Sequence, residues 1–294
     1  MEKNHSTANR RAIVVAKRYM GEFAWPTVLL TMLVVGAFIA NLALFIAGVV
    51  PWWLATLVYA ALTYMAYTPL HEATHANIHG DHASLKWLND ACGFVVAPII
   101  MIPYASHTVE HFTHHRYTNQ QGKDPDYMLH KMGDGWWAFL VTGLQFFWLQ
   151  NRFLYATRWH KVPGRERWIY LGEIAFSVSW RIALVAWVAT PAIVALLIVG
   201  YFLGGFFTAY WFAYRPHLPY RDAERYRNTC SMIMPRWMKP FEWFWLGQNL
   251  HSIHHLFPRV PFYRYHAVHR EIEPILRAEQ TPIIGIFSRE PVEP

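Results

Sequence analysis

The sequence predicts an all-α integral membrane protein built on two transmembrane helical hairpins, about four spans in total. Three observations lead to this fold class. Only 15% of the 294 residues are charged, whereas a soluble globular domain usually carries about 25%. Two long segments contain no Asp, Glu, Lys or Arg. Basic residues gather beside these segments, which is typical of the cytoplasmic side of a membrane.

The first hairpin is expected in residues 23–70, none of which is charged. This run is long enough for two spans of about 20 residues each. Pro51 lies near its middle, between two valines and two tryptophans, and marks the expected turn. The basic segment 1–22 that precedes the hairpin is expected to lie in the cytoplasm.

The second hairpin is expected around the uncharged run 182–214, together with the residues just before it, and with its turn near Gly200. Arg181 would then lie at the cytoplasmic end of a span and extend its guanidinium to the interface. Two shorter apolar stretches are less regular. Residues 91–109 contain two prolines, and residues 135–151 fit an interfacial helix.

Uncharged turns and basic flanks place both termini and the segment 71–135 in the cytoplasm. We expect a single membrane-embedded domain over residues 1–294, with the tail 271–294 also cytoplasmic. Cys92 and Cys230 form no disulfide framework, which fits a reducing compartment. The net charge of +7 lies beside apolar spans, so the expected partner is the anionic leaflet of a membrane rather than nucleic acid.

Histidine is the unusual residue, because the chain has 17 and many of them cluster. The first box is His71-Glu-Ala-Thr-His75, the second is His111-Phe-Thr-His114-His115, and the third is His251-Ser-Ile-His254-His255. Residues three and four apart share one face of a helix. One metal rarely takes more than four such ligands, so eight aligned imidazoles predict two metal ions. Neutral imidazole suits iron, copper, nickel and zinc.

The three boxes, their order and their placement around two hairpins resemble the membrane fatty-acid desaturase and hydroxylase superfamily, over roughly residues 25–270. Residues 247–258 and 261–265, with Arg215-Pro-His217, are most similar to the bacterial and cyanobacterial β-carotene hydroxylase branch. The first box departs from that branch, in which many members begin it with His-Asp. Here the pair is His71-Glu72, which puts the substrate in doubt more than the metal.

The resemblance implies two iron ions, dioxygen and an external, ferredoxin-like electron donor. It implies oxidation of an unactivated C–H bond in a long lipid from the bilayer, by hydroxylation or desaturation, in a bacterial inner membrane with the active site on the cytoplasmic side. A β-carotene ring is the first choice of substrate and a fatty-acyl chain the second. The implied iron ligands are His71, His75, His111, His114, His115, His217, His251, His254 and His255.

The ninth ligand of this set has two candidates. The resemblance implies a histidine between the second hairpin and the third box, and His217 is the only one there. His79, two turns after His71, remains an alternative. We expect Glu72 and Glu110 to orient ligand rings, since ligating imidazoles usually donate their second N–H to a carboxylate or carbonyl. Five further histidines are expected at the surface or the interface: His107, His130, His160, His266 and His269.

The sequence contains neither a cysteine cluster nor a Gly-rich dinucleotide motif. Electrons are therefore expected from a separate redox protein, which the basic cytoplasmic face would attract. A different function also has a motif in this chain. His71-Glu72-Ala-Thr-His75 matches H-E-x-x-H, in which the glutamate of a zinc metalloprotease acts as general base. That interpretation leaves the second and third boxes unexplained.

Overall fold

The computed structural model describes residues 2–288 and 290–292, and the side chains of all of these except 2–6, 146, 147, 149 and 150. Residues 1, 289, 293 and 294 of the predicted terminal segments lie outside the described residues. The α-helices and strands are α1 (Glu2–Lys17), α2 (Trp25–Ile46), α3 (Trp52–Thr74), α4 (Lys86–Ile100), α5 (Tyr104–Tyr117), α6 (Trp136–Thr157), α7 (Gly164–Val188), α8 (Pro191–Thr208), β1 (Ser231–Ile233), α9 (His251–Leu256), α10 (Tyr265–Ala278) and β2 (Ile283–Gly285).

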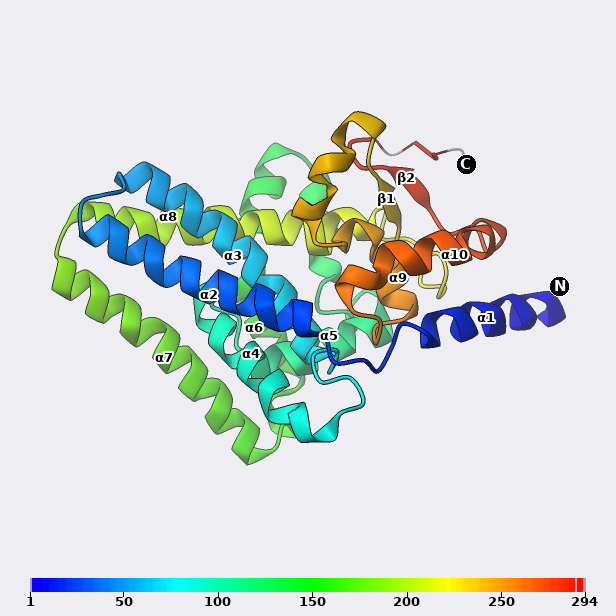
Figure 1. The fold of residues 1–294 in the computed structure, drawn as a ribbon, viewed down its shortest axis with the longest axis horizontal. Helices are drawn as coiled ribbons and strands as arrows, with labels where there is room; N and C mark the ends of the chain where they lie inside the picture. The colour runs from blue at the N-terminus through cyan, green and yellow to red at the C-terminus, as the bar shows by residue number, and fades with distance from the viewer. Residues whose placement is uncertain (1, 289, 293–294) are drawn as a thin grey trace.

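Short helical turns join these elements: η1 (Ala83–Leu85), η2 (Tyr127–Gly133), η3 (Trp159–Lys161), η4 (Ala209–Tyr214, a π-helix), η5 (Arg215–His217), η6 (Arg236–Trp245), η7 (Gln248–Leu250) and η8 (Phe262–Arg264). Long helices fill one end of the molecule, while α1, α9, α10 and the strands form a cap at the other end (Figure 1). Because α1 and β2 both belong to the cap, the two ends of the chain lie on the same side, as the hairpin topology predicts.

Helix α3 is the centre of the long-helix bundle. It packs against α2, α4 and α8, and most of its side chains from Tyr59 onward are buried. Its 23 residues extend about 34 Å, enough to cross the hydrocarbon core of a bilayer. A turn around Pro51 joins it to α2, so the predicted first hairpin is present.

Three helical segments are long and apolar enough to cross a membrane by length and composition: α2, α7, and α8 with its continuation to His217. Helices α4 and α5 pass the same test only as a pair, which is bent by 95°. The chain is therefore an all-α membrane protein with three or four such spans besides the central α3. Helix α6 exposes Trp136, Trp137 and Trp148, which agrees with the predicted interfacial helix.

The predicted turn of the second hairpin near Gly200 is wrong. Helix α7 ends at Val188, its cap residue Ala189 has a φ of 50°, and Pro191 begins α8 directly afterwards. Gly200 lies inside α8, against α3, where an added Cβ would be 2.8 Å from the Tyr59 ring. Small residues permit such close approach of membrane helices, so this glycine serves packing and not a turn.

One other expectation needs correction. Arg181 lies well inside α7, where it donates hydrogen bonds to the Tyr59 hydroxyl and the Ile99 carbonyl instead of extending to the interface. The fold also contains a parallel pair of short strands, with Ser231 opposite Ile283. This pair returns the C-terminal tail to the segment that precedes the third histidine box.

Gly204 gives a direct test of the α3–α8 packing. We expect Gly204→Ala to lower the free energy of unfolding by about 1–3 kcal/mol, the usual cost of overpacking, because its Cβ would lie 2.4 Å from the Ala60 carbonyl oxygen. Thermal unfolding of the detergent-solubilised protein measures this. Gly36→Ala on α2 is the control, since no atom lies within 4 Å of its Cβ position. An equal unfolding midpoint for the two variants would contradict the packing argument.

Candidate metal centre

The first histidine box is held by the C-terminal end of α3. His71 lies in the last turn of the helix and His75 caps it, with its N–H donated to the His71 carbonyl at 3.2 Å. The second box lies on α5 and the third on α9. These helices come from widely separated parts of the sequence and meet at the boundary between the bundle and the cap (Figure 1).

One group of imidazoles joins all three boxes. Donor nitrogens of His71, His75, His111 and His254 lie within 4.8 Å of one another. The Nε2 atom of His254 is 3.0 Å from Nε2 of His71 and 2.8 Å from Nε2 of His115. His115 is in turn 3.0 Å from His111 between Nε2 atoms.

A second group lies beside the first. Donor nitrogens of His114, His217 and His255 lie within 4.8 Å of one another, and the Nε2 atoms of His114 and His255 are 3.3 Å apart. The ring of His251 lies 4.8 Å from that of His255 and 5.1 Å from that of His217, between centroids. All nine imidazoles expected as ligands therefore lie together.

The two groups are contiguous. His115, His254 and His255 also bring their donor nitrogens within 4.8 Å, and the rings of His115 and His255 stack with 4.3 Å between centroids. Around a metal with bonds of about 2.0–2.1 Å to imidazole, neighbouring donors are about 3 Å apart. The observed nitrogen separations match that spacing, so these residues fit a pair of adjacent metal ions.

Burial sets the protonation state of the site. Removal from water lowers the pKa of His75 to about 3, with smaller contributions from His107 and Arg259. Burial similarly lowers the pKa of His251 to about 3, helped by His114 and His75. Both rings are therefore neutral at physiological pH, and the neutral imidazole is the form that binds a metal.

Groups behind the imidazoles fix the orientation of several rings. Nδ1 of His114 lies 2.8 Å from Oδ1 of Asp124. The same oxygen accepts the backbone N–H of Asp126, and Oδ2 of Asp124 accepts that of Asn119. Nδ1 of His254 lies 3.1 Å from the Tyr265 hydroxyl. Such partners hold a ligand ring with its other nitrogen toward the metal. In the sequence, Asp124-Pro-Asp126 is as consistent with a turn as with a partner of a ligand ring, whereas nothing in the sequence indicated this role for Tyr265.

The expected role of Glu72 is wrong. Its carboxylate accepts the backbone N–H of Phe262 at 3.2 Å and the side-chain amide of Asn77 at 3.3 Å, and Asn77 also donates to the Pro258 carbonyl. Glu72 therefore links the first box to the chain that follows the third. A carboxylate engaged in this way is not available as the general base of an H-E-x-x-H protease. Glu110 is buried, and its Oε1 atom has no hydrogen-bond partner among the described residues.

His107 was expected at the surface, and the structure corrects this. It is buried, and its ring stacks on that of His111 with 5.1 Å between centroids. It lies one helical turn before His111 on α5, and this spacing is the signal that sequence reasoning passed over. His269 is also buried. Within the described part of the chain, His79 belongs to neither group of converging nitrogens, whereas His217 belongs to the second.

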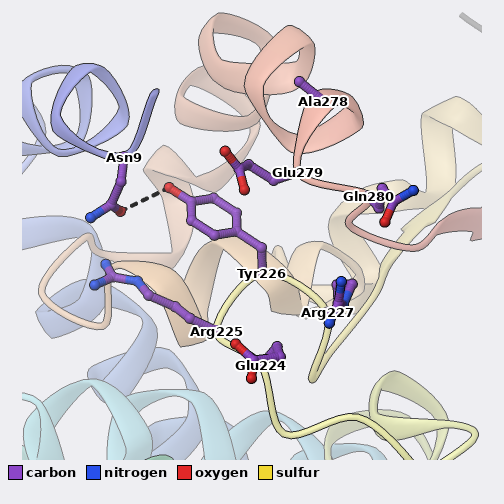
Figure 2. A pocket seen from close by; sticks show the side chains of 8 residues that line it. All are labelled: Asn9, Glu224, Arg225, Tyr226, Arg227, Ala278, Glu279 and Gln280. Atoms are coloured by element: carbon purple, nitrogen blue, oxygen red, sulfur yellow. Dashed lines mark hydrogen bonds between the residues drawn. The ribbon is translucent and has the colours of Figure 1, made fainter. Parts of the chain in front are cut away.

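The cap also has a polar pocket of about 480 Å³ between α1, the loop around Tyr226 and the end of α10. Figure 2 shows the Tyr226 hydroxyl hydrogen-bonded to Asn9, with Arg225 and Glu224 nearby. None of its lining residues is a histidine. The pocket is therefore separate from the candidate metal centre.

Asp124 allows a test of the centre that leaves every imidazole in place. We expect Asp124→Asn to weaken metal retention by about 10–100-fold, as is usual when the partner of a ligand ring is changed, because the charge that orients His114 is lost. Metal content after titration with a chelator measures this. The exposed Asp134 provides the control variant, Asp134→Asn. Equal retention by both variants would show that Asp124 does not support a metal ligand.

Comparison with known proteins agrees with this geometry. Residues 47–287 match the family model for fatty acid desaturases. The chain is 21% identical over 281 residues to an sn-1 oleoyl-lipid 12-desaturase of Anabaena variabilis, covering 85% of this chain and 76% of that protein. It is 23% identical over 289 residues to the sn-1 oleoyl-lipid 12-desaturase of Arthrospira platensis, covering 85% of this chain and 75% of that protein. The chain belongs to the fatty acid desaturase family.

Proposed function

We propose that this protein is a di-iron desaturase that introduces a double bond into an acyl chain of a membrane lipid. The observation that carries the proposal is the convergence of nine imidazoles, seven of them in two adjacent groups and two beside these, in a chain of the fatty acid desaturase family. The lipid desaturases among its relatives favour an acyl chain over the β-carotene ring that the sequence motifs suggested first.

The ligands assigned by the proposal follow the two groups. His71, His75, His111 and His254 would hold one iron, and His114, His217 and His255 the other, with His115 and His251 beside them. Two iron ions in these positions would supply the capacity to activate dioxygen and oxidise a saturated C–H bond. The protein's own contribution is to hold oriented imidazoles away from bulk water.

Aromatic side chains connect the centre with the membrane-spanning helices. The ring of Tyr67 stacks on that of His71, with 5.6 Å between centroids, and its centroid lies 4.7 Å from that of Phe212. The Phe212 centroid lies 5.1 Å from that of Tyr64. Tyr64 and Tyr67 occupy the part of α3 just before the first box, within the uncharged run. All three rings are buried, so they form an apolar, aromatic layer between the spans and the imidazoles that keeps water away from this side of the centre.

The overall reaction requires electrons that this chain does not carry. Dioxygen takes two hydrogens from the lipid, together with two electrons and two protons from a donor, and leaves as two waters. A ferredoxin-like protein is the proposed donor, attracted by the net positive charge of the chain. The proposed location is a bacterial inner membrane, with the imidazoles and both termini on the cytoplasmic side, and the basic residues beside the spans support this orientation.

Product analysis in a bacterial host tests this function. The host should contain oleoyl lipids and β-carotene, and the chain should be expressed there with a ferredoxin system. We expect mass spectrometry to show acyl chains lighter by two hydrogens, because a second double bond forms while the carotenoids stay unchanged. His254→Ala, which removes an imidazole close to both groups, should abolish the product.

His160→Ala is the matched control for this experiment, because His160 is exposed and belongs to neither group. This variant should retain full conversion. Carotenoids heavier by one oxygen, with unchanged acyl chains, would contradict the desaturase proposal and indicate ring hydroxylation. A product that persists in His254→Ala would contradict the assigned site.

A further inference from the structure

We propose that α4 and α5 form a re-entrant hairpin that enters and leaves the membrane on the side of the imidazoles, and that Glu173 and Arg181 of α7 are positioning residues that hold its bend. The topology rests on the structure alone. The consequence for iron binding also rests on the proposed function, because α5 carries the second histidine box.

Both ends of the α4–α5 pair lie level with the first histidine box. Near the start of α4, the Asn89 side chain donates to the Ala73 carbonyl at 2.9 Å, just beyond His71. Near the end of α5, the rings of His111 and His115 contact those of His71 and His75. The pair therefore begins and ends at the same end of α3.

The bend between the helices lies much deeper. The Ile99 carbonyl, at the end of α4, accepts the Tyr59 hydroxyl of α3 at 3.2 Å. Tyr59 precedes His71 by 12 residues, which is about 18 Å along a helix. The end of α4 thus lies roughly level with the middle of α3. Tyr104, at the start of α5, already reaches back to the first box, because its hydroxyl donates to the Ala73 carbonyl at 3.2 Å. The chain between these two helices, which are bent by 95°, therefore turns back instead of crossing.

A break in a helix at this depth leaves backbone groups without partners, and lipid cannot supply them. Arg181 supplies a hydrogen-bond donor to the backbone at the end of α4. One of its guanidinium nitrogens donates to the Ile99 carbonyl at 3.1 Å and to the Tyr59 hydroxyl at 2.7 Å, and another donates to the Ser177 carbonyl. The guanidinium also lies 4.3 Å from the Trp180 ring centroid.

Glu173 supplies hydrogen-bond acceptors to the backbone at the start of α5. Its two carboxylate oxygens accept the backbone N–H groups of Tyr104 and Ala105 at 2.6 and 3.1 Å. These are orphan donors of the first helical turn, where a negative charge is also favoured. Glu173 and Arg181 are two turns apart on α7, so one helix supplies both the hydrogen-bond acceptor and the hydrogen-bond donor that the bend needs.

The bend needs this support because it lies beside lipid. Met101, which follows α4 with a φ of 55°, lines an apolar groove of about 530 Å³ together with Arg181, Val185 and Leu197. His111 follows Tyr104 by two helical turns on α5. A change in the angle at the bend would therefore move the second box relative to the first and third.

Cysteine accessibility tests the topology independently of enzyme activity. Ser84→Cys and Lys123→Cys place exposed thiols before α4 and after α5, and Val49→Cys marks the opposite side. The native Cys92 and Cys230 are buried and give little background. A membrane-impermeant maleimide should label positions 84 and 123 from one face of the membrane and position 49 from the other. Labelling of 84 and 123 from opposite faces would overturn the re-entrant hairpin.

Iron binding tests the positioning role. Glu173→Ala and Arg181→Met should each lower iron affinity by about tenfold, the lower end of the range for residues behind metal ligands, at temperatures where circular dichroism shows the helices intact. Glu173→Gln keeps one carbonyl acceptor and should lose less. Glu166→Gln, an exposed change in the first turn of the same helix, is the control.

Iron affinity of Glu173→Gln and Arg181→Met equal to that of the Glu166→Gln control would overturn the positioning role. This holds even if Glu173→Ala fails to fold. Neither the labelling nor the iron titration requires lipid turnover. A failure of the proposed reaction is therefore distinguishable from a failure of this inference.

Discussion

The Nε2 atom of His254 lies 3.0 Å from that of His71 and 2.8 Å from that of His115, so one nitrogen from each histidine box meets at a single point away from bulk water. Buried nitrogens at this spacing need a shared partner, because neutral rings can supply only one proton each to the contacts between them. The rest of the fold follows from that constraint. Three helices distant in sequence must end within a few ångströms of each other and stay there.

Membrane-helix packing and hydrogen-bonded partners of the rings meet this requirement together. Gly200 and Gly204 bring α8 against α3, so that His217 follows the end of α8 into the second imidazole group. Asp124 and Tyr265 hold individual rings, while Glu72 links the first box to Phe262. Glycines, carboxylates and a tyrosine hydroxyl thus position the imidazoles without belonging to the two imidazole groups themselves.

The sequence alone predicted the parts of this structure that depend on local pattern. Uncharged runs indicated the helices, and three- and four-residue spacing indicated which imidazoles share a face. Both patterns are local in the sequence and can be recognised without knowledge of the tertiary fold. The turn of the second hairpin was misplaced because glycine favours turns and close helix packing alike, and only the neighbour α3 distinguishes them. Arg181 and Glu173 were misread or passed over because their partners are far away in sequence. His107 differs, because its local spacing from His111 on α5 was a signal that sequence reasoning passed over.

The link between Glu72 and Phe262, with Asn77 bonded to the Pro258 carbonyl, has a consequence for the biogenesis of the protein. The first box emerges from the ribosome well before the residues that its carboxylate contacts and before its neighbours in the third box. Both hairpins have therefore been synthesised before the imidazoles can assemble, since chains fold as their segments become available. A metal ion held by all three boxes could be bound only after the chain has been translated beyond residue 262.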